Sequence, residues 1–205
     1  MYDLIGDIHG HAAELKSPLA KMDYEEIEGV WQHPERKVIF LGDFVDRGPE
    51  QVETVNIARN MVENGQALAV MGNHEFNAVA WAMEDPQNPG QYLRPHIQKN
   101  LKQHKAFLEQ VGERSELHRS MIEWFKTLPV YLDLPGLRVV HVCWHPDYLR
   151  IISQYTDDQN RFKNFCVSCS ERTSNMTVPL FLSLVALISN FQAISYPVKM
   201  FEKCG

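Results

Sequence analysis

The sequence predicts an α/β protein in which a largely parallel β-sheet is covered by helices. Three short apolar runs, at residues 2–5, 38–41 and 67–71, each stop at a glycine, as buried parallel strands often do. Helical patterns lie between these runs, and alternation of strand and helix indicates βαβ units. A chain of 205 residues is long enough for one domain with a substantial core.

The first two helices and the loop that follows them are predicted from apolar spacing and from turn residues. Residues 11–22 and 50–64 carry apolar side chains at helical spacing, and Gly65 provides a C-cap for the second helix. Residues 84–95 are rich in Pro and Gly and are predicted to form a loop.

Two further helices and a pair of strands complete the predicted domain. The helices are expected at residues 97–111 and 115–127, and two strands flank a turn at residues 134–137. His141 then stands at the end of a fourth strand. Three aromatic side chains fall on apolar helix faces and are predicted in the core rather than at a substrate site: Trp81, Trp124 and Phe125.

Composition changes near Asn164, which divides the chain into a predicted domain at 1–163 and an atypical apolar tail at 164–205. The charged residues of this tail are only Glu171, Arg172, Lys199, Glu202 and Lys203. Its apolar stretch at 178–191 is interrupted by polar residues and is shorter than the roughly 20 residues of a membrane span. A buried helix or strand pair is therefore favoured over a span, and a tail that is not the native continuation is a third alternative.

Charge and cysteine content narrow the classes of partner. A formal net charge of −6 gives no electrostatic reason to expect a nucleic-acid polymer as partner. No basic and apolar leader precedes the first strand, so the expected location is the cytoplasm and no membrane partner is expected. Cys166 and Cys169 have metal-knuckle spacing, but without a second pair they are interpreted as incidental thiols.

Polar residues gather just after the predicted strands. They are Asp7 and His9, Asp43 and Asp46, Asn73 and His74, and finally His141. Because the carboxyl ends of parallel strands meet at one edge of a sheet, these side chains are expected to converge. Mixed imidazole, carboxylate and amide ligands suit a pair of divalent first-row metal ions, and one carboxylate can hold two ions roughly 3.5–4 Å apart. Each motif alone could be a turn or a helix cap, but the three in order favour a metal site.

The motifs GDIHG at 6–10, GDFVDRG at 42–48 and GNHE at 72–75 resemble the signatures of the calcineurin-like metallophosphoesterases. The resemblance covers residues 1 to about 163. It is greatest to a bacterial branch near the Ser/Thr protein phosphatases and the symmetrical diadenosine tetraphosphatases. It implies an αββα sandwich that is incomplete at the C-terminus. It also implies hydrolysis of a phosphoester by a hydroxide that bridges two divalent cations, with Mn²⁺ favoured over Fe, Zn, Ni or Co.

The same resemblance implies a set of metal ligands. Asp7, His9 and Asp43 would bind the first ion. Asp43 would bridge to a second ion, which is held also by Asn73 and His141.

Three further residues receive roles in catalysis from the resemblance. His74 would donate a proton to the leaving oxygen, Asp46 would orient the ring of His74, and Arg47 would clamp the phosphate. Phosphoproteins, dinucleoside polyphosphates and small phosphomonoesters all stay open as substrates.

Two departures from the family pattern bear on function. Met71 stands where the protein phosphatases have an arginine before GNHE, which weakens the prediction of a phosphoprotein substrate. The family also supplies a later metal-ligating histidine from a Gly-His motif, whereas the only histidine after His141 is His145. A loop position near the site is favoured for His145 over a role as substitute ligand.

These departures and the apolar tail suggest a truncated or frame-shifted member of the family. The alternative function is then a catalytically weak or inactive metal-binding remnant, and a membrane-anchored phosphatase is a third hypothesis. Among the remaining histidines, His11 is predicted at a helix N-terminus. The others are predicted on the surface: His33, His96, His104 and His118.

Overall fold

A three-stranded parallel sheet organises the fold. Its strands are β1 (Tyr2–Ile5), β4 (Lys37–Phe40) and β5 (Ala67–Ala69), in the order β1-β4-β5. Both neighbouring pairs are parallel, with Ile5 opposite Phe40 and Phe40 opposite Ala69. The three strands therefore end at one edge of the sheet, as the sequence predicts.

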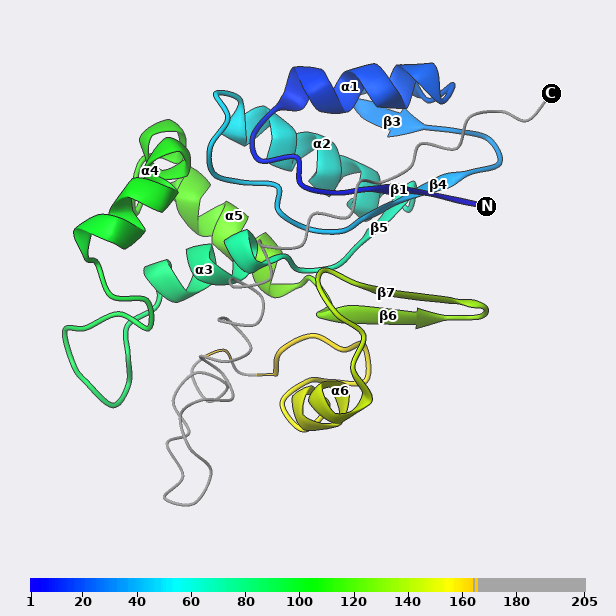
Figure 1. Ribbon diagram of the computed structural model, residues 1–205. Coiled ribbons are helices and arrows are strands. Elements are labelled where there is room, and N and C mark those ends of the chain that lie inside the picture. The colour runs from blue at the N-terminus through cyan, green and yellow to red at the C-terminus, as the bar shows by residue number, and fades with distance from the viewer. Residues whose placement is uncertain (164, 166–205) are drawn as a thin grey trace.

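The computed structural model describes residues 1–163 and 165 (Figure 1). Its helices are α1 (Ala12–Lys21), α2 (Gln51–Glu63), α3 (Asn73–Ala82), α4 (Gln98–Val111), α5 (Glu116–Lys126) and α6 (Pro146–Ile152). Two antiparallel hairpins are formed by β2 (Glu25–Ile27) with β3 (Val30–Gln32), and by β6 (Tyr131–Leu134) with β7 (Leu137–Val140). The second hairpin confirms the predicted strand pair that precedes His141.

The two faces of the central sheet pack against different layers. Val38 and Phe40 belong to the large core shared with the helices, whereas Ile39 packs with Val70 and with Val139 of β7. This alternation follows from the two-residue period of a strand. Figure 1 shows α1 and α2 on one side of the sheet, the β6–β7 hairpin on the other, and α6 beyond the hairpin. The order helix, sheet, sheet, helix agrees with the predicted αββα layers.

Helices α3, α4 and α5 extend the core beyond the sheet. Trp81 of α3 is buried, as are Trp124 and Phe125 of α5, which confirms that these aromatic residues belong to the core. Phe107 of α4 is fully buried and lies against Phe125, with ring centroids 6.0 Å apart. Burial of a side chain of this size contributes roughly 1.5–3 kcal/mol to stability.

Predictions on residues 164–205, including the apolar tail and the Cys166–Cys169 pair, lie outside the described residues apart from Phe165. Within the part of the chain that the structure describes, no helix is both long and apolar enough to cross a membrane.

Close contacts between glycines let the loops at the strand ends meet. Gly42 has a φ of +88°, and a Cβ atom there would lie 2.3 Å from the backbone nitrogen of Gly72. At Gly48 a Cβ atom would lie 2.4 Å from the carbonyl oxygen of Gly10. The loops after β1, β4 and β5 can therefore approach one another only because these positions lack side chains.

Substitution of Gly42 tests this packing. We expect Gly42→Ala to lower the free energy of unfolding in urea by about 3 kcal/mol or more, because the methyl group meets rigid backbone at a left-handed φ. The matched control is Gly29→Ala. Gly29 also has a positive φ, +79°, but no atom of the described residues lies within 4 Å of a Cβ added there. That control is expected to cost only about 1 kcal/mol. Equal losses would show that the contact with Gly72 is unimportant.

Candidate metal centre

The site lies at the edge of the sheet where β1, β4 and β5 end. Several of its residues adopt left-handed backbone conformations, at φ 54° for Asp7, 49° for His9, 58° for Asp43, 70° for Asp46 and 71° for Arg47. Such strain in residues other than glycine is concentrated at functional sites, where the surrounding structure maintains it. The strained turns aim the polar side chains into one space.

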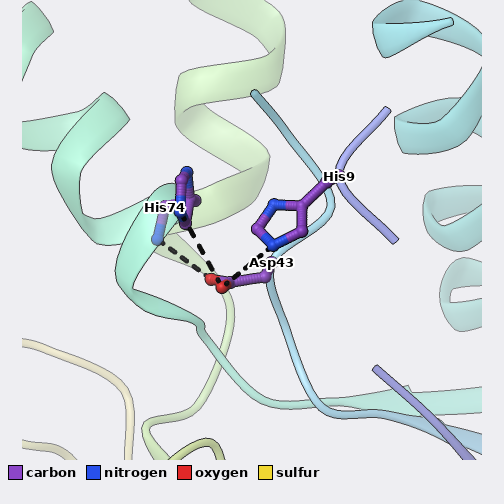
Figure 2. Close-up of side chains that lie close together, drawn as sticks. All are labelled: His9, Asp43 and His74. Atoms are coloured by element: carbon purple, nitrogen blue, oxygen red, sulfur yellow. Dashed lines mark hydrogen bonds and ion pairs between the residues drawn. The ribbon is translucent and has the colours of Figure 1, made fainter. Parts of the chain in front are cut away.

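The carboxylate of Asp43 is the centre of this arrangement. Its Oδ2 atom lies 3.7 Å from Nε2 of His9, 3.9 Å from Nε2 of His74 and 3.5 Å from Nε2 of His141. The Oδ1 atom accepts a hydrogen bond of 3.1 Å from the backbone N–H of His74. Figure 2 shows Asp43 between the rings of His9 and His74. The loops after β1 and β4, the start of α3 and the end of β7 thus meet at one carboxylate.

The three imidazoles present the same nitrogen because each has its other nitrogen occupied. Nδ1 of His9 donates to the Val45 carbonyl at 3.1 Å, and Nδ1 of His141 donates to the Leu41 carbonyl at 2.6 Å. Nδ1 of His74 donates to Oδ2 of Asp46 at 2.6 Å. Hydrogen bonds of this kind orient histidine ligands in metal sites. Nε2 of each ring is left to face Asp43.

The concentrated charge shifts the pKa values of Asp43 and His141 in the metal-free protein. Burial alone would raise the pKa of Asp43, but the hydrogen bond and charge of His141, with the charge of His74, lower this pKa to about 2. Burial would lower the pKa of His141, but Asp43 raises it to about 9. Asp43 is therefore ionised in a site that attracts positive charge.

Two groups of side chains have donor atoms close enough to hold a metal ion. One consists of His9, Asp43 and His74, and the other of Asp7, Asp43 and His141; within each group the donor atoms lie within 4.8 Å of one another. Asp43 is the member that both groups share. Asp7 and His9, expected together on the first ion, fall in different groups, and His74, expected as a proton donor, joins His9.

Asn73 also reaches the site. Its Oδ1 atom lies 3.0 Å from Nε2 of His141, so the amide oxygen and the imidazole face the same point. Asn73 is the first residue of α3 and His74 the second, so the start of one helix places both side chains. The structure thus brings all five expected metal ligands and His74 together.

Asp46 and Arg47 differ in environment. Asp46 is 1% exposed, and its Oδ1 atom accepts a hydrogen bond of 2.8 Å from Nδ1 of His104. Burial would raise the pKa of Asp46, but hydrogen bonds from His104 and His74 lower it. Arg47 is exposed and makes no hydrogen bond or ion pair with the described residues.

Glu75 is a site residue that received no role from the sequence. It is fully buried, and its carboxylate accepts backbone N–H bonds from Gly72 at 3.0 Å and from Asp43 and Phe44 at 2.8 Å each. Burial and the charge of Asp43 raise its pKa to about 7. Glu75 joins the loop after β4 to the start of α3. Its place three residues after Gly72, the N-cap, is the capping-box position that could have revealed it.

The prediction that His104 and His118 lie on the surface is wrong, since they are 0% and 3% exposed. His104 shares a helix face with Phe107, Leu108 and Val111, all buried, at spacings of three, four and seven residues. This apolar stripe is the signal that could have placed His104 inside.

The remaining histidines lie away from the candidate ligand groups of the described residues. His33 is half-buried, while His96 is exposed and stacks on Trp81 with ring centroids 3.8 Å apart. His11 is the N-cap of α1, which confirms its predicted position. His145 is exposed at the N-cap of α6 and belongs to neither group.

Comparisons with known proteins agree with this geometry. The family model for calcineurin-like phosphoesterases matches residues 2–168. The asymmetrical bis(5'-nucleosyl)-tetraphosphatase PrpE of Anoxybacillus flavithermus is 39% identical over 156 residues, which cover 73% of this chain and 60% of the relative. The enzyme of that name from Halalkalibacterium halodurans is 39% identical over 140 residues, which cover 68% of this chain and 54% of the relative.

Among solved structures, a cold-active protein-tyrosine phosphatase of a psychrophilic Shewanella species matches with a TM-score of 0.50 and 15% identity. The match covers 93% of this chain and 62% of that one, and it bears on the fold alone. The chain spans about half to three-fifths of the length of the curated relatives it matches. Since the family model covers most of its length, the chain belongs to the calcineurin-like phosphoesterase family.

Proposed function

We propose that this protein hydrolyses phosphoesters at a site holding two divalent metal ions, with Mn²⁺ the favoured ion. The observation that carries the proposal is the position of Asp43, whose Oδ2 atom lies within 3.9 Å of three imidazole nitrogens and which belongs to both candidate ligand groups. A carboxylate with two oxygens can serve two ions at once, and no other residue of these groups is shared between them.

The donor chemistry fits divalent first-row ions. Asp7 and Asp43 offer carboxylate oxygens, and Asn73 offers an amide oxygen. His9 and His141 offer their Nε2 atoms, which face the site because the Nδ1 atom of each ring is hydrogen-bonded to a backbone carbonyl. When bound, such ions would neutralise charge on the phosphate group, and they would supply hydroxide at neutral pH by lowering the pKa of bound water. The protein holds these ligands in place through the hydrogen bonds of Glu75, the strained turns and the close contacts between glycines.

We assign to His74 the donation of a proton from Nε2. Its Nδ1–H is held by Asp46, so the ring cannot turn away from the site. Burial would lower the pKa of His74, but the hydrogen bond to Asp46 and the charges of Asp43 and Asp46 raise it above the ordinary value. The imidazolium is therefore stabilised near neutral pH, where it can protonate the leaving oxygen of a phosphoester.

Two observations bear on the substrate. Met71 is buried in the core, so the position that carries an arginine in protein phosphatases contributes no charge to the site here. The curated relatives named above are dinucleoside tetraphosphatases. We therefore propose a dinucleoside polyphosphate as substrate, with Arg47 as the residue that binds phosphate through its two parallel N–H groups.

Substitution at the shared carboxylate tests the proposed reaction. We expect Asp43→Asn and His74→Asn each to reduce Mn²⁺-dependent hydrolysis of p-nitrophenyl phosphate by about 100-fold or more, because one loses the shared ligand and the other the proton donor. Asp147→Asn, a change of the same kind at an exposed position of α6, is the control and should retain full activity. An inactive wild-type protein would favour the metal-binding remnant instead.

Metal binding itself can be measured without turnover. At a free Mn²⁺ concentration 100 times Kd, the free energy of unfolding should rise by roughly 2.7 kcal/mol for each ion that binds only the folded protein. Thermal unfolding with and without EDTA reports the change, and Asp43→Asn should abolish most of it. If Mn²⁺ stabilises the Asp43→Asn variant as much as the wild type, Asp43 is not a metal ligand.

The substrate class can be tested at Arg47. We expect kcat/KM for a dinucleoside tetraphosphate to exceed that for a phosphoserine peptide. Arg47→Lys should raise KM about 10-fold. Lysine cannot form the two parallel hydrogen bonds that an arginine makes to a phosphate group, and a hydrogen bond to a charged group is worth about 1.5–3 kcal/mol. Steady-state kinetics on both substrates give these values. A preference for the phosphopeptide would contradict the proposed substrate.

A further inference from the structure

We propose that His104 is a positioning residue that fixes Asp46 and, through it, the ring of His74. The inference rests on the proposed function, because it assigns a part in that reaction to a residue outside the metal centre. Its basis is a continuous chain of hydrogen bonds from His104 through both oxygens of Asp46 to His74.

The first step concerns the two oxygens of Asp46. Oδ2 accepts from Nδ1 of His74 at 2.6 Å, and Oδ1 accepts from Nδ1 of His104 at 2.8 Å. The backbone N–H of Asp46 donates to Oε1 of Gln51 at 2.7 Å. An ionised carboxylate can only accept, so both histidines must carry a proton on Nδ1. The carboxylate is therefore held from two sides and cannot rotate without breaking a buried hydrogen bond.

The second step concerns the surroundings of His104. His104 lies on α4, 58 residues after Asp46 in the sequence, and its side chain is fully buried between aromatic rings. The ring centroids of His104 lie 5.0 Å from Phe107 and 5.9 Å from Trp81. An apolar side chain such as leucine would still bury its surface among these rings. It would, however, leave Oδ1 of Asp46 buried without a donor, which is costly for a charged group.

The third step connects this bond to catalysis. With Asp46 fixed, His74 keeps its proton on Nδ1 and presents Nε2 to Asp43 and the site. If Oδ1 lost its donor, the carboxylate could turn and the tautomer and direction of His74 would no longer be set. The chemical step should then slow, while phosphate binding at the exposed Arg47 should not change.

His118 offers a matched control within the same core. It is also buried, its ring centroid lies 5.8 Å from that of Phe107, and its Nδ1 atom accepts a hydrogen bond from the backbone N–H of Arg114 at 3.0 Å. Like His104, it has a buried Nε2 atom with no hydrogen-bond partner among the described residues. Unlike His104, it makes no contact with Asp46.

The test compares His104→Leu, His104→Asn and His118→Leu in the full chain. Asparagine places an amide N–H near the position of the histidine Nδ1–H, so it can still donate to Asp46. We expect His104→Leu to lower kcat by about 10-fold to 100-fold with KM nearly unchanged, and His104→Asn to restore most of kcat. His118→Leu should lower the melting temperature without lowering kcat.

A second readout does not depend on activity. In metal-free protein at a pH above the pKa of His74, where the ring is neutral, the ¹⁵N chemical shifts of this ring should show one tautomer with the proton on Nδ1 in the wild type and in His104→Asn. In His104→Leu, these shifts should move towards the average of two tautomers. If His74 is unchanged in His104→Leu, or if the Asn and Leu variants lose kcat equally, His104 is not a positioning residue. If the wild type hydrolyses no phosphoester, the proposed function fails while the shifts still decide the role of His104.

Discussion

The structure depends on the contacts of one buried carboxylate. Asp43 is surrounded by the Nε2 atoms of three histidines that come from the loop after β1, from the start of α3 and from the end of β7. A buried charge is stable only when such partners surround it. Glycine contacts bring the loops close, and Glu75 ties the backbone of Asp43 to the start of α3. The fold and the candidate site are therefore stabilised by the same interactions.

Charge balance explains why so many histidines gather here. Asp43, Asp46 and Glu75 are all buried within this small region. Asp46 accepts hydrogen bonds from His74 and His104, and Asp43 lies beside His141. Among the described residues, Glu75 accepts hydrogen bonds from backbone N–H groups, and burial together with the charge of Asp43 raises its pKa. Divalent cations at Asp43 would replace the positive charge that protonated imidazoles supply in the metal-free protein.

The sequence predicted the parallel strands and the convergence of the metal-site residues because both follow from local pattern. Apolar runs that end at glycine define the strands, and a parallel register brings their ends to one edge. The β2–β3 hairpin and α6 were not predicted, because strands of three residues and a helix of seven are too short to show periodicity. The bond of His104 to Asp46 joins residues 58 positions apart and depends on how α4 packs, which local pattern does not reveal.

The central claim is that Asp43 is shared between two metal ions, and anomalous diffraction from crystals grown with Mn²⁺ tests it most directly. The account predicts two anomalous peaks roughly 3.5–4 Å apart, with one oxygen-bearing side chain, that of Asp43, in contact with both. A single peak, or two peaks of which Asp43 touches only one, would contradict it.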